Sequence, residues 1–268
     1  MAETNSIEPA SEGAHRNLLA GNIGSYGRYR DGAFAHLREI GVQYVEIPVP
    51  LPEQIGAVRA QLDRYGLGTL TLLTPCDVSS EEGTAAFATL LPAFTALGTR
   101  IAFVSVKHGD TPLPLCYERL RRIGDAAARV GVTLAVETHP PFAHNADAAL
   151  ATINGVDHPH VRLNYDTGNV YFYNQDFQGL SDLERIKDYV VAVHLKDTDG
   201  GFHSWHFPAL GEGVVDFPEV FRILNGRGFY GPFTMELEGI QGENLSEAET
   251  WQRVTHSVHH LRQHGLVP

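Results

Sequence analysis

Short hydrophobic runs alternate along the chain with longer segments in which hydrophobic residues recur at helical spacing. The short runs, many of them rich in β-branched residues, have the length and composition of buried strands. Eight such strands are predicted, at residues 17–23, 44–49, 68–74, 100–108, 132–138, 161–166, 190–195 and 232–237. The segments that follow them predict eight helices, at residues 31–40, 52–65, 81–97, 114–130, 145–154, 181–187, 217–226 and 246–264.

Eight strands that alternate with eight helices predict a (β/α)8 barrel, a fold that a single domain of about 250 residues commonly forms. The alternative is an open, doubly wound sheet, whose first turn usually carries the spacing G-x-G-x-x-G. Here residues 20–27 read AGNIGSYG, which lacks that spacing. We therefore expect one α/β domain, a TIM barrel over residues 16–268, preceded by a polar and flexible tail at residues 1–15.

Charge and cysteine content narrow the classes of partner. The 268 residues include 20 basic and 32 acidic side chains, for a net charge of −12. An acidic surface repels nucleic acid and anionic lipid, although a local basic group could still hold a small phosphorylated substrate. Two cysteines give no disulfide framework, and neither a signal peptide nor a membrane-spanning run is evident. We expect a cytoplasmic protein that binds neither nucleic acid nor membranes.

Polar residues gather where the predicted strands end, which is the reactive face of such barrels. Glu137, Asp166, His194 and Glu236 end four successive strands, each about one βα unit of ~30 residues apart except for a longer loop before Glu236. Three carboxylates and one imidazole that converge would repel one another without a cation. We therefore predict one divalent metal ion, with Mn²⁺ favoured and Mg²⁺, Co²⁺ or Zn²⁺ as alternatives.

The chain resembles the xylose-isomerase-like TIM-barrel superfamily of sugar isomerases and epimerases in five segments: LAVETH (134–139), RLNYDTGN (162–169), VVAVHLKD (190–197), PALGEGVVDFPEVFRIL (208–224) and GFYGPFTMELEG (228–239). The resemblance implies that the four strand-end residues ligate one metal ion and that Glu137 and Glu236 are the acid/base pair. Many relatives have a histidine where Asn169 stands. This departure from the ketose 3-epimerase pattern resembles inosose-type relatives instead.

Several other polar side chains are candidates for contacts with the substrate or for further acid/base duty. They are Glu46, Lys107, His108, His139, Asn169, Lys196 and, in the aromatic loop 197–213, His206. Glu46 and the two lysines could equally form ion pairs at the barrel rim. The aromatic loop could equally be a packed surface loop or a subunit contact.

The expected reaction starts from a carbonyl sugar or keto-sugar. A metal ion that polarises the carbonyl acidifies the neighbouring C–H, and the resulting enediolate can isomerise, epimerise or eliminate. A sugar isomerase/epimerase is the leading hypothesis, with an inosose dehydratase or a 3-keto-glycoside deglycosidase as the alternative. A related metal-dependent nuclease fits the acidic charge poorly, and a non-enzymatic sugar-binding role fits the intact ligand set poorly. The protein could act as a homo-oligomer or with a partner subunit.

Overall fold

Eight parallel strands close into a barrel in the computed structural model, which describes residues 16–268. The predicted tail at residues 1–15 lies outside the described residues. Around the barrel the strands follow the order β1-β11-β9-β8-β7-β5-β3-β2. Their bounds are β1 (Leu19–Asn22), β2 (Tyr44–Pro48), β3 (Thr71–Leu73), β5 (Ile101–Val104), β7 (Thr133–Glu137), β8 (Val161–Asp166), β9 (Val190–Leu195) and β11 (Phe233–Met235). The prediction of a single-domain (β/α)8 barrel is confirmed.

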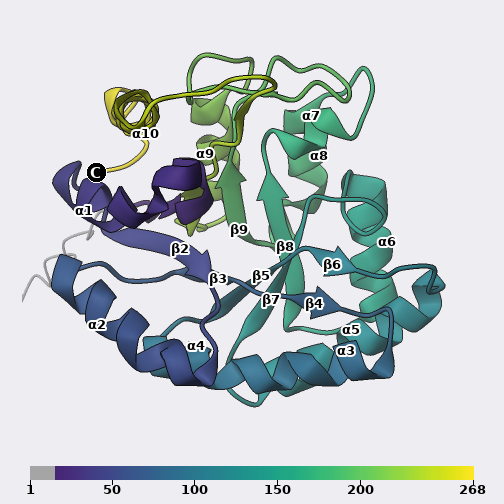
Figure 1. Ribbon diagram of the computed structural model, residues 1–268. Helices are drawn as coiled ribbons and strands as arrows, with labels where there is room; N and C mark the ends of the chain where they lie inside the picture. Colours follow the sequence, from purple (N-terminus) through teal and green to yellow (C-terminus); the bar gives the residue numbers. More distant parts are fainter. Residues whose placement is uncertain (1–15) are drawn as a thin grey trace, which may run out of the picture.

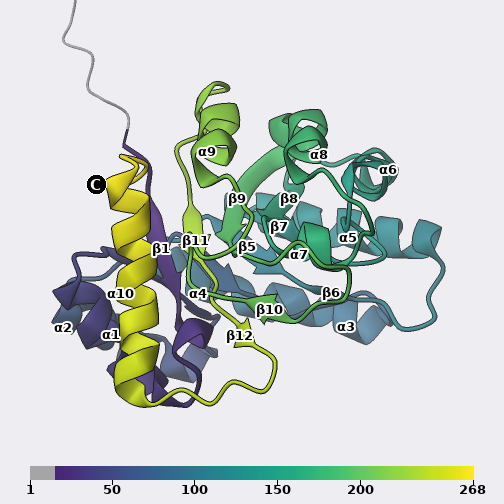
Figure 2. The same ribbon diagram turned by 90° about the horizontal axis from the view of Figure 1, so that it is seen from above.

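Helices surround the strands in chain order, as Figure 1 shows. They are α1 (Ala33–Glu39), α2 (Ile55–Tyr65), α3 (Glu81–Ala86), α4 (Leu91–Leu97), α5 (Leu113–Ala128), α6 (Ala146–Val156), α8 (Gly179–Ile186), α9 (Phe217–Asn225) and α10 (Glu247–Gln263). The last helix lies beside β1 and α1 (Figure 2), where Trp251 stacks on His36 at a ring-centroid distance of 4.9 Å. This contact joins the two ends of the described chain and completes the ring of helices.

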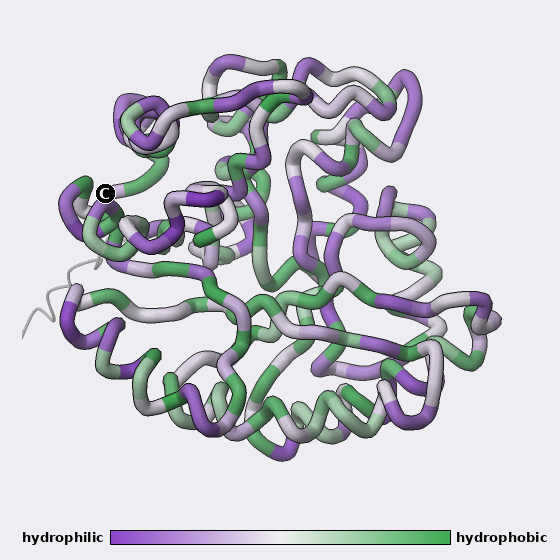
Figure 3. Tube along the Cα trace, viewed as in Figure 1, coloured by the Kyte–Doolittle hydropathy of each residue, from purple (hydrophilic) through white to green (hydrophobic). Residues whose placement is uncertain are grey.

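The hydrophobic core lies between the barrel and the ring of helices, and hydrophobic segments run along the central strands in Figure 3. Helix α9 shows the reason in its sequence, because Phe217, Val220, Phe221 and Leu224 recur at helical spacing and are all buried. Gly21 of β1 permits a close approach of α1, since a Cβ atom there would lie 2.7 Å from Leu37 Cδ2. Replacing Gly21 by Ala would require the Leu37 side chain to move.

Two predicted strands are each divided in the structure. The run 68–74 is β3 and is followed after Pro75 by β4 (Cys76–Asp77), and the run 100–108 is β5 followed by β6 (Val106–Lys107). Proline has no N–H to donate, so the barrel ladder of β3 does not continue through it. Strands β4 and β6 pair with each other in a separate two-stranded parallel sheet. Lys107 is therefore placed outside the barrel sheet.

Four features at the carboxyl ends of the barrel strands were not predicted. They are the 3-10 helix η1 (Ile23–Gly32), the short helix α7 (Asn169–Phe172), and strands β10 (His206–Phe207) and β12 (Gly239–Ile240), which pair antiparallel. Helix α7 and strands β10 and β12 are too short for a periodic pattern to identify them, and η1 buries only Ser25 and Tyr26, so it carries no periodic hydrophobic face. Among residues 16–268, no helix combines the length and hydrophobicity that crossing a membrane requires.

Candidate metal centre

Three of the four predicted ligands converge at the carboxyl ends of neighbouring strands. One potential ligand atom from each of Asp166, His194 and Glu236 lies within 4.8 Å of the other two. The parallel register causes this convergence, because Asp166 pairs with His194 across β8 and β9, and Glu236 follows directly after β11. Asp166 and His194 are fully buried, and the side chain of Glu236 is 15% exposed. We refer to these three residues as the triad.

The donor set of the triad fits a divalent cation. Asp166 Oδ1 accepts hydrogen bonds from the backbone N–H groups of Gly168 and Asn169, both at 2.8 Å. Asp166 Oδ2 is buried and faces cationic groups, with Lys196 Nζ at 3.0 Å and His194 Nδ1 at 3.9 Å. An oxygen that already faces a cationic side chain is a position that a metal ion can take in place of that side chain. Two carboxylates with one imidazole suit Mn²⁺, Mg²⁺ or Zn²⁺, and no feature of the triad selects among them.

Glu137, the fourth predicted ligand, ends β7 beside the triad but does not belong to it. Its Oε1 accepts a hydrogen bond of 3.3 Å from Asn169 Nδ2, and Ser105 also bonds to the carboxylate. Burial raises the pKa of Glu137, and the negative charge of Glu236 raises it further. The role of Glu137 as a metal ligand stays a prediction.

His194 is held between two carboxylates. Its Nε2 lies 3.0 Å from Glu46 Oε1, and its Nδ1 lies 3.0 Å from Glu236 Oε2. Burial opposes protonation of the imidazole, but Glu236 and Glu46 outweigh burial and raise the pKa of His194 well above its usual value. A carboxylate behind the second ring nitrogen fixes the orientation of a ligating histidine in many metal sites.

Glu46 is itself fully enclosed. Its Oε2 accepts a hydrogen bond of 2.5 Å from Thr71 Oγ1, and its Oε1 accepts one of 2.9 Å from Asn22 Nδ2. The side chain is 0% exposed. Sequence reasoning selected Glu46 for the substrate and missed Asn22 and Thr71. Asn22 carries the same signal as the triad, a polar residue that ends a predicted strand, and this signal could have identified it.

Lys196 places an ammonium group against the triad. Its Nζ is 3.0 Å from Asp166 Oδ2 and 2.9 Å from Glu236 Oε2. It also donates to Glu238 Oε2 at 2.8 Å and to Asn169 Oδ1 at 3.0 Å. Burial of this 1%-exposed side chain opposes its charge, but the surrounding carboxylates prevail and raise the pKa of Lys196 well above its usual value. The buried cluster therefore contains a cation of its own.

The environment shifts the pKa values of the two triad carboxyl groups in opposite directions. Burial raises the pKa of Asp166 to about 6 even though Lys196 favours the charged form. Burial acts on Glu236 in the same sense, but His194 and Lys196 together hold its pKa well below the usual range. Glu236 is thus anionic, whereas Asp166 and Glu137 retain protons more readily than exposed carboxyl groups do.

The remaining predicted residues have their contacts elsewhere. Lys107 is 74% exposed and forms a 3.1 Å ion pair with Asp77, which is the rim ion pair considered as its alternative role. The ring of His108 meets the edge of Phe142, and that of His139 meets Tyr173. His206 lies in β10 opposite Ile240. Asn169 and Lys196, in contrast, lie beside the triad. Contacts of all six residues with a substrate stay predictions.

The structure defines the class of protein as a TIM barrel with a candidate metal centre. The evidence is the closed parallel barrel, with two carboxylates and an imidazole at the carboxyl ends of its strands. Within this class, the chain belongs to the family described as xylose isomerase-like TIM barrel, whose profile matches residues 34–263. The resemblance of the sequence to this family is confirmed.

Curated relatives include the L-ribulose-5-phosphate 3-epimerases UlaE of Salmonella paratyphi A and Salmonella typhimurium. The chain is 34% identical to each over 138 residues, which are 49% of this chain and 47% of the relative. The chain thus aligns with about half the length of these curated relatives. The similarity to the two 3-epimerases is limited to these 138 aligned residues.

Solved structures with the same fold include D-allulose 3-epimerase from Methylomonas sp. in complex with D-allulose. It superposes with a TM-score of 0.74 at 18% identity and covers 93% of this chain and 98% of that one. A structure of L-ribulose 3-epimerase gives a TM-score of 0.72 at 17% identity, over 92% and 93% of the two chains. At these identities the superpositions establish the fold.

Proposed function

We propose that this protein is a metal-dependent epimerase of a carbonyl sugar, with Glu137 and Glu236 as its acid/base pair. The observation that carries the proposal is the buried triad at the carboxyl ends of β8, β9 and β11, with Glu137 beside it. Support comes from the family, whose members similar to this chain include proteins named as sugar 3-epimerases.

Asp166, His194 and Glu236 would hold a divalent metal ion, with Glu137 as the fourth ligand and Mn²⁺ as the ion we favour. When bound, such an ion polarises a carbonyl oxygen and offsets the negative charge that develops on it. Glu46 would hold the ring of His194 in place through its contact with Nε2. Removing Glu46 would leave the ring free to turn.

The two glutamates have the properties of an acid/base pair because their environments push their pKa values apart. Cations beside Glu236 keep it anionic, so it can accept a proton from the carbon next to the carbonyl. Burial raises the pKa of Glu137 in the metal-free protein, so of the two glutamates it is the one that more readily carries a proton and can return it. Strands β7 and β11 are separated in the barrel by β8 and β9, so the two groups approach from different sides. Removal on one face and return on the other inverts the carbon.

A lyase is the second candidate, and the specific observation that favours it is Asn169. Many relatives have a histidine at this position, whereas here the amide Nδ2 contacts Glu137 and Oδ1 accepts from Lys196. An amide cannot exchange a proton with the sugar as an imidazole can. The enediolate left after proton removal could then expel a substituent from the neighbouring carbon instead of being reprotonated.

Hydrogen exchange in deuterated solvent tests the epimerase directly. The protein with added Mn²⁺ is incubated with ketohexoses and ketopentoses, and deuterium at C3 is followed by NMR together with the epimeric ratio. We expect deuterium in the epimer, loss of exchange in Glu137→Gln and Glu236→Gln, and normal exchange in Glu118→Gln, a control at an exposed position of α5. Exchange that persists in both active-site variants would refute the pair. Release of aglycone from a 3-keto-glycoside without an epimer would favour the lyase.

A further inference from the structure

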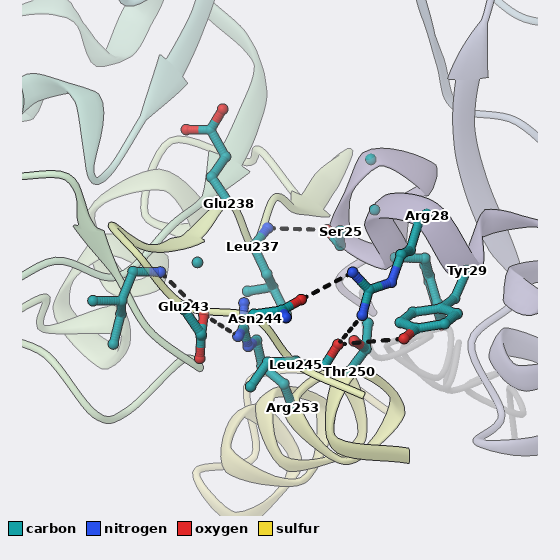
Figure 4. Close-up of a pocket in the computed structure, with 15 residues that line it drawn as sticks. Ser25, Arg28, Tyr29, Leu237, Glu238, Glu243, Asn244, Leu245, Thr250 and Arg253 are labelled. Atoms are coloured by element: carbon teal, nitrogen blue, oxygen red, sulfur yellow. Dashed lines mark hydrogen bonds and ion pairs between the residues drawn. The ribbon is translucent and has the colours of Figure 1, made fainter. Parts of the chain in front are cut away.

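A polar cavity of about 320 Å³ opens beside the candidate metal centre. One wall is the start of η1, from Gly24 to Tyr29. The other comprises residues 237–240, residues 243–245, and Thr250 and Arg253 of α10. Figure 4 shows Arg28 and Tyr29 facing Asn244 and Leu245 across it, with Glu238 standing apart from them. Both walls follow strands of the barrel, β1 and β11, so the cavity lies on the same face as the triad.

Hydrogen bonds tie both walls to the triad. Asn22 Nδ2 donates to Glu236 Oε1 at 3.2 Å, and Asn22 Oδ1 accepts from the N–H of Gly24 at 2.6 Å. The opposite wall continues directly from Glu236, and its Leu237 N–H donates to Ser25 Oγ at 2.9 Å. No triad residue lines the cavity, but Glu238 does, and its Oε2 lies 2.8 Å from Lys196 Nζ, which is 2.9 Å from Glu236 Oε2. The cavity is therefore one side chain away from the triad.

The carboxylates that line the cavity are paired with cations, whereas Arg28 is not paired with a carboxylate. Each carboxylate has a cation, because Glu238 pairs with Lys196 and Glu243 pairs with Arg253. Arg28, in contrast, donates only to neutral oxygens: Nη1 to Asn244 Oδ1 at 2.9 Å and Nη2 to the Leu245 carbonyl at 3.0 Å. No carboxylate pairs with Arg28 among residues 16–268. Its guanidinium carbon also lies over the Tyr29 ring, 4.9 Å from the centroid, a cation–π contact.

An oriented guanidinium without a counter-ion favours an anion, and its fork of N–H donors matches phosphate oxygens. We propose that this cavity binds the phosphate of a phosphorylated ketose whose carbonyl end reaches the triad, with Arg28 as the phosphate ligand. The inference rests on the proposed function, because it names the substrate class of that same site. Arg28 is exposed to solvent, and a phosphate would pair with its charge whereas a neutral sugar hydroxyl would not, which is the reason to favour a phosphate.

Binding of inorganic phosphate tests the cavity without any turnover. The full chain, freed of metal with EDTA so that phosphate has no metal ion to bind, is titrated calorimetrically with phosphate. Charge-assisted hydrogen bonds are strong enough that Arg28→Gln should weaken binding by at least about tenfold. Arg30→Gln is the matched control, since Arg30 is exposed in the same 3-10 helix and does not line the cavity. Equal losses in both variants, or no binding to the unaltered protein, would overturn the proposal.

Substrate preference separates this inference from the proposed function. With Mn²⁺ added, C3 exchange is measured on L-ribulose 5-phosphate and on L-ribulose. We expect the phosphate ester to be preferred and Arg28→Gln to reduce that preference by at least about tenfold. Efficient exchange of free ketoses with no preference for the ester would refute the phosphate site and leave the epimerase standing. Phosphate binding that depends on Arg28 without exchange of either sugar would refute the epimerase and leave the site standing.

Discussion

Replacing Lys196 by Met should destabilise the metal-free protein and strengthen its binding of divalent metal. The ammonium of Lys196 lies within 3.0 Å of Asp166 Oδ2 and Glu236 Oε2, two oxygens of the triad. In the metal-free protein it is the counter-ion of these carboxylates and of Glu238. A divalent ion bound by the same oxygens would repel the ammonium, so the two cations compete.

The magnitude follows from the burial of Lys196, which is 1% exposed. Removing one partner from a buried ion pair costs about 3–5 kcal/mol, because an uncompensated charge stays behind. For a domain of this size, about 1 kcal/mol lowers the melting temperature by about 2–4 °C, so we expect a fall of about 6–20 °C. Two like charges about 4 Å apart near a protein surface repel by about 4 kcal/mol, so metal affinity should rise by at least about tenfold.

Calorimetric unfolding after EDTA treatment and titration with Mn²⁺ measure the two effects separately. Lys107→Met is the matched control, because it removes a lysine that is 74% exposed and paired only with Asp77. It should change neither quantity measurably, as expected of a surface ion pair. An Lys196→Met variant with unchanged metal-free stability would refute the counter-ion role. Weaker metal binding would show that Lys196 positions the ligands for the metal and does not compete with it.

Four further variants test the metal site, the support of His194 and a buried carboxyl group outside the site. Glu236→Gln should lose both metal binding, measured by calorimetry, and C3 exchange, measured by NMR. Glu137→Gln should lose exchange and keep most of its metal affinity. Equal losses of metal affinity in the two variants would place Glu137 among the essential ligands. Glu46→Gln should lower metal affinity by about 10–100-fold through the loosened His194, and unchanged affinity would refute that support. Asp182 is buried, and burial raises its pKa to about 6. The folded state therefore binds the proton more tightly than the unfolded state does. The resulting contribution to the free energy of unfolding is full below pH 4 and is lost as pH rises through 6. Relative to Asp182→Asn, the unaltered protein should gain about 1 kcal/mol between pH 8 and pH 5 in urea unfolding; a constant difference would contradict the assignment.

The sequence predicts the barrel well because its elements are repeated and long. Every strand of the barrel lies within a predicted hydrophobic run, and the strand-end rule selects Asp166, His194 and Glu236 correctly as a converging group. Convergence follows from the parallel register alone, which places strand ends on one face whatever the details of packing. The identity of the metal ion cannot follow from such a rule, because carboxylates and imidazole bind several divalent ions.

Contacts that depend on loop conformation could not be predicted in the same way. Pro75 signals a break in its strand, but nothing in the sequence shows that β4 and β6 then pair and carry Lys107 away from the barrel sheet. The position of Lys196 shows the same limit. Its place at the end of β9 is predictable, whereas its contact with three carboxylates depends on how its side chain lies across Gly168, where a Cβ atom would be 2.7 Å from Lys196 Cγ.

The charge of the buried cluster supports the proposed divalent ion. Two cationic side chains, His194 and Lys196, face more carboxylates than they can neutralise: Glu46, Glu137, Asp166, Glu236 and Glu238. The raised pKa values of Asp166 and Glu137 are the response of the metal-free protein, which reduces the excess negative charge by retaining protons. A divalent cation would remove the same excess without these protons, and it would also displace a proton from His194, because a ligating imidazole is neutral. The cluster thus carries a net negative charge that Lys196 and His194 do not neutralise, and the oxygens of Asp166 and Glu236 are where a metal ion should bind in place of the Lys196 ammonium.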